Sequence, residues 1–297
     1  FLDRHLPEGQ HEPGCDETMT DTTPEPVPAI PSATILLLRE QSQGLEVFLV
    51  QRHHQVDFAM GALVFPGGKV DPADREPGLR EKCSGAPDSD DDLAVWVAAI
   101  RETFEESGIL LARPGTSAEL VSGERLREIE GRHRDALNRG QTCLREIVDT
   151  EDLTLACDLL VRFAHWITPE LAPKRFDTHF FLVAAPPDQV ALHDGGESVD
   201  STWTTPSAAL TDADAGRCTI VFPTRLNLMK LGRSRAVEEA LATARTSAIV
   251  TVMPRIEQTD AGTVLRIPAE ANYDVVETLL DSHPSPFKGG SPFKGRG

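Results

Sequence analysis

Cysteine is scarce in this chain, and its distribution excludes a protein built on cysteine zinc sites or on a disulfide framework. The five cysteines are scattered, and no two of them are spaced as a zinc-binding pair or as part of a disulfide framework: Cys15, Cys83, Cys143, Cys157 and Cys218. The chain also lacks a secretory signal pattern and any apolar run close to the length of a membrane span. We therefore expect a soluble cytoplasmic protein in a reducing compartment.

Positive charge is in short supply as well. The chain has 29 Lys and Arg against 47 Asp and Glu, which gives a formal net charge of −18. Nucleic acids and anionic membranes normally require a basic surface, so neither is expected as a partner. A small phosphate ester stays compatible with this charge, because the repulsion is screened within about 8 Å at physiological salt and because bridging cations offset it.

Both ends of the chain lack the apolar periodicity of a folded core. Residues 1–31 are rich in Pro, Thr, Glu and Asp and are predicted to be a disordered tail. Residues 284–297 contain Ser-Pro-Phe-Lys-Gly twice and are predicted to be a low-complexity tail.

Strand-like runs alternate with helix-like stretches between these tails, which predicts one α/β domain over residues 32–283. The spacing of apolar residues, together with glycine and proline as breakers, locates the individual helices and strands. Strands are expected at 33–38, 47–51, 62–65, 159–167 and 175–184, and helices within 118–148 and at 206–213 and 223–232.

Residues 101–109, Arg-Glu-Thr-Phe-Glu-Glu-Ser-Gly-Ile, carry the strongest chemical signal. At about 100° per residue, Glu102, Glu105 and Glu106 fall on one side of a helix whose other side is apolar. Three carboxylates this close repel one another, and a hard cation such as Mg²⁺ or Mn²⁺, which takes oxygen ligands, relieves the repulsion. The pattern indicates a divalent-metal site, and a solvated acidic face is the alternative that this segment alone leaves open.

Upstream, residues 61–71 form an apolar run that ends in Pro-Gly-Gly, as expected of a strand running into a turn. Gly67 and Gly68 have no Cβ, so the backbone can approach a ligand closely. Joined to the acidic helix, this segment resembles the Nudix box, G-x(5)-E-x(7)-REUxEExGU, of the Nudix hydrolases. In the helix half, Thr103 is polar where the family prefers an aliphatic residue.

The first half of the box departs from the family pattern in two ways. Asp74 stands where the family has Glu, and Asp is one methylene shorter. Residues 75–100 then separate Asp74 from Arg101, which is 26 residues, 19 more than the box allows. We interpret the excess as a loop inserted at about residues 75–91, because long loops add little closure entropy.

The split box resembles the branch of the family that contains the peroxisomal coenzyme A diphosphatases and their bacterial relatives. Residues 165–181 and Phe222-Pro-Thr-Arg-Leu-Asn-Leu228 are similar to segments of that branch, and the similarity spans roughly residues 32–255. The coenzyme A pattern places arginines before the Phe-Pro-Gly-Gly segment, whereas this chain has Asp57, Phe58 and Ala59 there.

The resemblance implies an α/β/α sandwich with a central mixed sheet and metal-dependent hydrolysis of a diphosphate bond in a nucleoside diphosphate derivative, of coenzyme A or dinucleotide type. A non-catalytic module that senses such a compound is the alternative, and a homodimer is compatible with the family. The implied metal ligands for Mg²⁺ or Mn²⁺ are Glu102, Glu105, Glu106 and Gly67. The implied catalytic residues are Glu102, Glu105 and Arg101, and the substrate-binding candidates are Arg52, Gly67, Gly68 and Lys69.

Other candidates have both a functional and a structural interpretation. Glu170 and Glu197, besides Glu102, are candidates for the general base, and both also fit solvated loop positions. Arg175 could contact a substrate phosphate. Trp203 could stack on a base, although a core position is the favoured interpretation. The tandem His53 and His54 are interpreted as loop residues, because neighbours on a strand point to opposite faces.

Overall fold

The computed structural model describes residues 27–52, 61–193, 195, 198–260 and 262–279. A nine-stranded mixed sheet is at its centre, with the order β10-β3-β2-β1-β8-β7-β11, while β4 also pairs with β1 and β9 with β2. Its strands are β1 (Ile30–Gln41), β2 (Gly44–Arg52), β3 (Ala62–Val64), β4 (Gly67–Lys69), β7 (Val161–Ile167), β8 (Phe176–Ala184), β9 (Ser198–Thr204), β10 (Thr219–Ile220) and β11 (Thr251–Val252).

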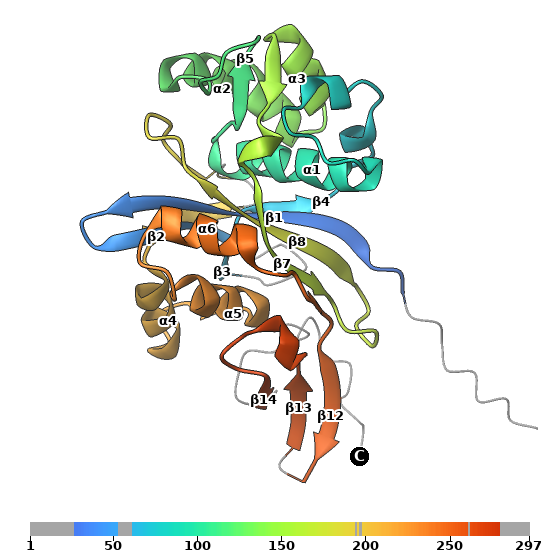
Figure 1. The fold of residues 1–297 in the computed structure, drawn as a ribbon, viewed down its shortest axis with the longest axis vertical. Helices are drawn as coiled ribbons and strands as arrows, with labels where there is room; N and C mark the ends of the chain where they lie inside the picture. The colour runs from blue at the N-terminus through green and yellow to red at the C-terminus, as the bar shows by residue number, and fades with distance from the viewer. Residues whose placement is uncertain (1–26, 53–60, 194, 196–197, 261, 280–297) are drawn as a thin grey trace, which may run out of the picture.

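Helices cover both faces of the sheet (Figure 1). One layer holds α1 (Asp90–Ser107), α2 (Gly123–Asn138) and α3 (Leu144–Thr150), and the other holds α4 (Pro206–Asp214), α5 (Phe222–Leu231) and α6 (Val237–Thr246). The strand period of two divides the core between the layers: Ile35 and Leu37 pack in one cluster and Leu36 and Leu38 in the other. The expected α/β/α sandwich with a mixed sheet is confirmed.

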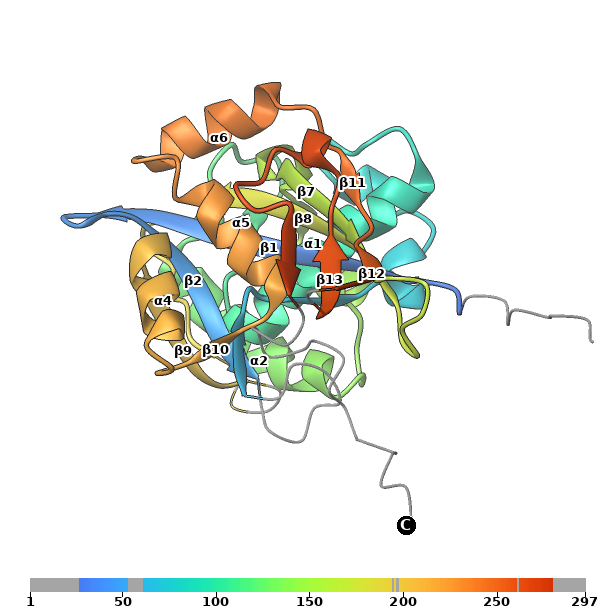
Figure 2. The same ribbon diagram turned by 90° about the horizontal axis from the view of Figure 1, so that it is seen from below.

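Smaller elements complete the fold. Short 3₁₀ helices are η1 (Pro72–Arg75), η2 (Arg80–Lys82), η3 (Cys157–Leu159) and η4 (Ala269–Ala271). A two-stranded sheet joins β5 (Ala112–Pro114) to β6 (Leu153–Leu155). A three-stranded sheet of β12 (Arg255–Thr259), β13 (Gly262–Arg266) and β14 (Glu277–Leu279) lies beside α5 (Figure 2).

Helix α1 begins and ends where its sequence provides caps. The Ser89 side chain accepts a hydrogen bond from the Asp92 backbone N–H, and three aspartates in the first turn complement the helix dipole. Gly108 ends the helix with φ of 74°, a left-handed conformation that favours glycine. These signals place the carboxylates in the last two turns of the helix.

Several boundaries differ from the sequence-based expectations. The helical stretch expected within 118–148 is two helices, because Gly140 turns the chain with φ of 64° after α2 ends. The expected turn after Pro66 is the short strand β4, and the segment interpreted as an inserted loop contains η2 and the first residues of α1. Strand β1 begins at Ile30, inside the segment expected to be disordered. Within the described ranges, no helix combines the length and hydropathy needed to cross a bilayer.

Candidate active site

The acidic end of α1 lies against the two glycines of β4. The Gly67 N–H donates a hydrogen bond to Glu106 Oε2 at 2.9 Å. A Cβ on Gly68 would be 2.3 Å from Glu102 Oε1, so this approach requires glycine. Strand β4 is held in place by antiparallel pairing with β1, in which Thr34 lies opposite Gly67. The structure therefore brings the helix carboxylates and the Pro-Gly-Gly segment together.

Arg101 connects this acidic cluster to η1 and to the end of β4. Its Nε and Nη2 donate to the two carboxylate oxygens of Asp74, each at 2.9 Å, and Nη2 also donates to the Lys69 backbone oxygen at 2.8 Å. Its Nη1 donates to Glu102 Oε1 at 2.9 Å and to Glu105 Oε2 at 2.7 Å. A single buried guanidinium thus orients three carboxylates.

Asp74 is a structural residue that the sequence analysis left without a role. Its side chain is 1% exposed, and it also accepts a hydrogen bond from the Asp71 backbone N–H at 2.8 Å. Asp71 and Asp74 form a reciprocal capping box around η1, with a proline in the first turn. The sequence Asp-Pro-Ala-Asp carried this capping signal.

The electrostatics of the cluster are unbalanced. Burial raises the pKa of Glu105 to about 8, and the charge of Glu102 adds to the shift although the Arg101 guanidinium opposes it. Burial also works against the charge of Arg101, but its hydrogen bond with Asp74 and the nearby Glu102 raise the pKa of Arg101 above its ordinary value. One arginine is therefore not enough positive charge for the carboxylates around it.

A divalent cation fits this donor set. Glu102, Glu105 and Glu106 line one cavity and offer only oxygen ligands, which Mg²⁺ and Mn²⁺ prefer. Burial and the charge of Glu102 disfavour the charged form of Glu105, and a cation beside it would favour that form. Gly67, the expected backbone ligand, lines the same cavity.

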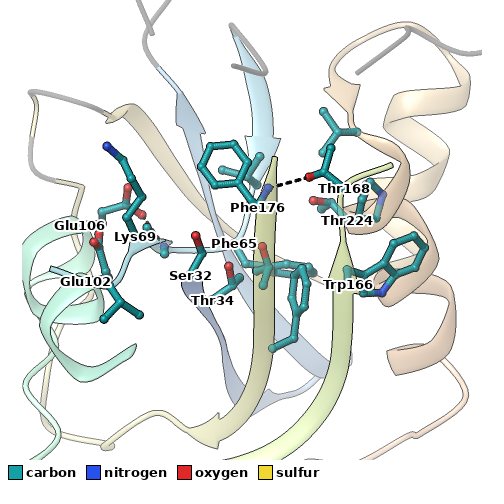
Figure 3. Close-up of a pocket in the computed structure, with 18 of the residues that line it drawn as sticks. Ser32, Thr34, Phe65, Lys69, Glu102, Glu106, Trp166, Thr168, Phe176 and Thr224 are labelled. Carbon is teal, nitrogen blue, oxygen red and sulfur yellow. Dashed lines mark hydrogen bonds between the residues drawn. The ribbon is translucent and has the colours of Figure 1, made fainter. Parts of the chain in front are cut away.

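The cavity has a volume of about 980 Å³ and is formed by several distant segments. Figure 3 shows Glu102, Glu106 and Lys69 on one side, Trp166 and Thr224 on the other, and Ser32 and Thr34 between them. Arg101, Gly68 and Glu105 also line it. The volume lies in the range of pockets that bind small molecules.

Aromatic side chains line part of the cavity, and we call this set the aromatic wall. It consists of Phe65, Trp166, Phe176, Phe180 and Phe222. Phe176 and Phe180 alternate with outward residues along β8, and this period of two was visible in the sequence. These residues could not be assigned to the site from the sequence, because their convergence depends on how β8, β7 and α5 pack.

Three exposed cations also line the cavity: Lys69, Arg139 and Lys174. Lys69 was expected from the sequence, whereas the other two were not. Lys174 lies 5.6 Å from the centroid of the Phe176 ring, and Arg139 forms an ion pair with Asp135 at 3.2 Å. They place positive charge at the cavity, as a phosphorylated ligand requires.

Other sequence candidates lie elsewhere. Glu170 is exposed in the loop between β7 and β8 and does not line the cavity. Arg175 is buried and donates to the backbone oxygens of Thr168 and Val27, so it holds the chain rather than the cavity. Trp203 packs on Phe48, with ring centroids 5.2 Å apart, as its core interpretation requires. Four further candidates, His53, His54, Glu197 and the side chain of Arg52, lie outside the described residues.

Comparisons with known proteins agree with this architecture. A family model described as the NUDT19 Nudix domain matches residues 79–231. The acyl-coenzyme A diphosphatase NUDT19 of Homo sapiens is 30% identical over 57% of this chain and 55% of its own length. The protein of the same name from Xenopus laevis is 24% identical, covering 79% of this chain and 73% of its own. The chain therefore spans little more than half of the human relative.

A solved structure extends the likeness to three dimensions. The crystal structure of a NUDIX hydrolase from Alicyclobacillus acidocaldarius aligns with a TM-score of 0.64 and 29% identity. The alignment covers 74% of this chain and 99% of that one.

Proposed function

Because the chain belongs to the Nudix hydrolase family, we propose that it hydrolyses a diphosphate bond in a nucleoside diphosphate derivative with the help of Mg²⁺ or Mn²⁺. The observation that carries this proposal is the convergence of Glu102, Glu105 and Glu106 with the β4 glycines in one cavity. Nudix hydrolases generally use divalent metals, and the oxygen donors of α1 suit such ions.

The side chains of the cavity have separable tasks in this proposal. Glu102, Glu105 and Glu106 hold the cation, which when bound neutralises phosphate charge and lowers the pKa of water. Arg101 orients Glu102 and Glu105 through its hydrogen bonds at 2.9 and 2.7 Å. We assign the proton of the attacking water to Glu102 or Glu105, both of which line the cavity and would serve as the general base.

The cavity also supports a proposal about the substrate. Lys69, Arg139 and Lys174 offer positive charge for phosphates, and the aromatic wall offers apolar area for a base or an acyl group. The two NUDT19 relatives carry the name acyl-coenzyme A diphosphatase. An acylated coenzyme A, which combines charged phosphates with an apolar chain, matches both halves of the cavity, and dinucleotides are the second substrate class to assay.

The decisive experiment is turnover of the purified chain with Mn²⁺ or Mg²⁺ and a panel of acyl-coenzyme A esters, coenzyme A and dinucleotides, with the products identified by mass spectrometry. We expect cleavage within the diphosphate and loss of turnover by about two to three orders of magnitude in Glu106→Gln. Glu238→Gln, a change at an exposed position on α6, is the matched control. If Glu106→Gln left turnover unchanged, these carboxylates would have no role in catalysis.

The same panel tests the sensing module as the alternative. A binding module would retain the compound without cleaving it at any concentration of Mn²⁺ or Mg²⁺. If calorimetry showed binding and no products formed, the chain would be a binding module that does not hydrolyse the compound.

A further inference from the structure

A second group of side chains that could hold a metal ion lies on β7 and β8, outside the cavity. His165 on β7 lies directly across from His179 on β8, and Asp177 lies two residues before His179 on the same face. Phe176, Thr178 and Phe180, which alternate with them, line the cavity. The group lies on the face of the sheet that α1 covers, because His179 pairs with Ala33 of the core cluster beneath α1, and none of its three residues lines the cavity.

The donor atoms of this group converge. His165 Nε2 is 2.5 Å from Asp177 Oδ1, and His179 Nε2 is 3.9 Å from the same oxygen. The two imidazole rings are stacked, with centroids 4.1 Å apart and planes 13° apart. Of the residues that the structure describes, these are the only three His, Cys, Asp or Glu side chains whose donor atoms all lie within 4.8 Å of one another.

A hydrogen bond accounts for only part of this arrangement. Asp177 is close enough to bond His165, but 3.9 Å is too long for a hydrogen bond to His179. The donor atoms of the two rings and the carboxylate are close enough to share one ion after one ring turns out of the stack, since the lone pair of an imidazole nitrogen lies in the plane of its ring. The three side chains are 17%, 34% and 20% exposed, so an ion and a water can reach them.

His165 is also held as metal-binding histidines are. Its Nδ1 is 2.8 Å from Thr251 Oγ1 on β11, the strand that pairs with β7 beside it. When the Nδ1 proton is donated to that hydroxyl, the lone pair of Nε2 faces Asp177 and His179. A contact of this kind at the other ring nitrogen supports the ring orientation of a histidine that binds a metal.

We propose that His165, Asp177 and His179 bind a divalent transition-metal ion of the Zn²⁺ class at a site distinct from the α1 carboxylates. Two imidazoles and one carboxylate suit Zn²⁺, which accepts nitrogen and oxygen ligands and adopts four-coordinate geometry with water as the fourth ligand. The α1 carboxylates, in contrast, offer oxygen only and suit Mg²⁺ or Mn²⁺. The ion joins β7 to β8, and because His165 also contacts Thr251, it secures β11 as well.

The test is a titration of the full chain, stripped of metal with EDTA and dialysed, with ZnCl₂ by calorimetry and with CoCl₂ by visible absorption. We expect one Zn²⁺ per chain to bind in the wild type, with tetrahedral Co²⁺ bands at the same stoichiometry. Asp177→Asn and His179→Gln should each weaken this site by about tenfold or more, at least the loss caused by removing a supporting hydrogen bond of a ligand.

Control variants separate this site from other histidines and from the active site. His193→Gln, whose histidine contacts Ser201 at 3.1 Å outside the group, should bind as the wild type does. Glu106→Gln should lose turnover but keep Zn²⁺ binding, so that this proposal and the proposed function fail separately. His179→Phe keeps a ring for stacking, and its metal-free melting temperature and circular dichroism establish that loss of binding is not loss of fold.

Three results would overturn the proposal. They are no stoichiometric Zn²⁺ binding by the wild type, unchanged affinity in both Asp177→Asn and His179→Gln, and loss of the site in Glu106→Gln alone. If the wild type bound no Zn²⁺, His165 and Asp177 would be a hydrogen-bonded pair with the His179 ring stacked beside them. If Glu106→Gln alone lost the site, the ion would bind at the α1 carboxylates.

Discussion

Replacing Asp74 by Asn tests whether the buried guanidinium of Arg101 depends on this carboxylate. The side chains are 1% and 9% exposed, so neither charge is solvated. Asp74 accepts three hydrogen bonds, two from Arg101 and one from the Asp71 backbone N–H. Asn removes the charge and turns an NH₂ group toward one of these donors.

Breaking a buried ion pair typically costs about 3–5 kcal/mol. Arg101 keeps Glu102 and Glu105 as partners, so we expect the lower end, about 3 kcal/mol. For a urea m-value of about 3 kcal/mol per M, the unfolding midpoint would fall by about 1 M. Circular dichroism during urea titration measures this shift.

Asp91→Asn is the matched control. Asp91 is 86% exposed and pairs with a half-exposed Arg75, and such pairs contribute at most about 1 kcal/mol. If Asp74→Asn lowered the midpoint no more than Asp91→Asn does, the argument that Asp74 stabilises a buried charge would be refuted.

One further substitution probes the cavity, and another probes the buried hydrogen bonds behind Trp166. Gly68→Ala would place a Cβ 2.3 Å from Glu102 Oε1 and displace that carboxylate, so we expect turnover to fall about a hundredfold. Gly131→Ala is the control, because a Cβ there meets nothing within 4 Å and turnover should be unchanged. Equal turnover in the two variants would contradict this geometry. Tyr273→Phe removes a hydroxyl that accepts from Trp166 Nε1 at 2.9 Å and donates to Asn227 Oδ1 at 2.7 Å, so we expect a loss of about 1–3 kcal/mol in urea unfolding. Burial raises the pKa of Tyr273 above its ordinary value of 10.0, so its contribution is complete below about pH 10 and is lost as pH rises further; an equally steep alkaline loss in the Phe variant would exclude Tyr273 as its cause.

Local signals in the sequence were sufficient for α1. Its caps, its apolar sector and its three glutamates all follow from the 3.6-residue period and from residues within the helix or next to it. The same holds for the alternating strands β1, β2, β7 and β8, whose predicted positions agree with the structure to within a few residues. Helix α2 was wrongly extended, because Gly140 was not given weight as a breaker.

Contacts between distant segments could not be predicted from the sequence. Arg101 and Asp74 lie 27 positions apart. The sequence shows Asp74 at the position of the family glutamate but does not show that Arg101 is its partner. The aromatic wall joins residues of β7, β8 and α5 with Phe65, and His165 meets His179 only through the antiparallel register of β7 and β8.

The sequence by itself therefore determined the main strands, the acidic helix and the three neighbouring carboxylates on it, since each depends on periodicity and charge over a few turns of chain. Only the tertiary structure decided which residues share the cavity, which carboxylate holds Arg101 and which histidines face each other. These depend on strand register and on the packing of two layers against one sheet, and a shift of one residue in register would turn each such side chain to the opposite face.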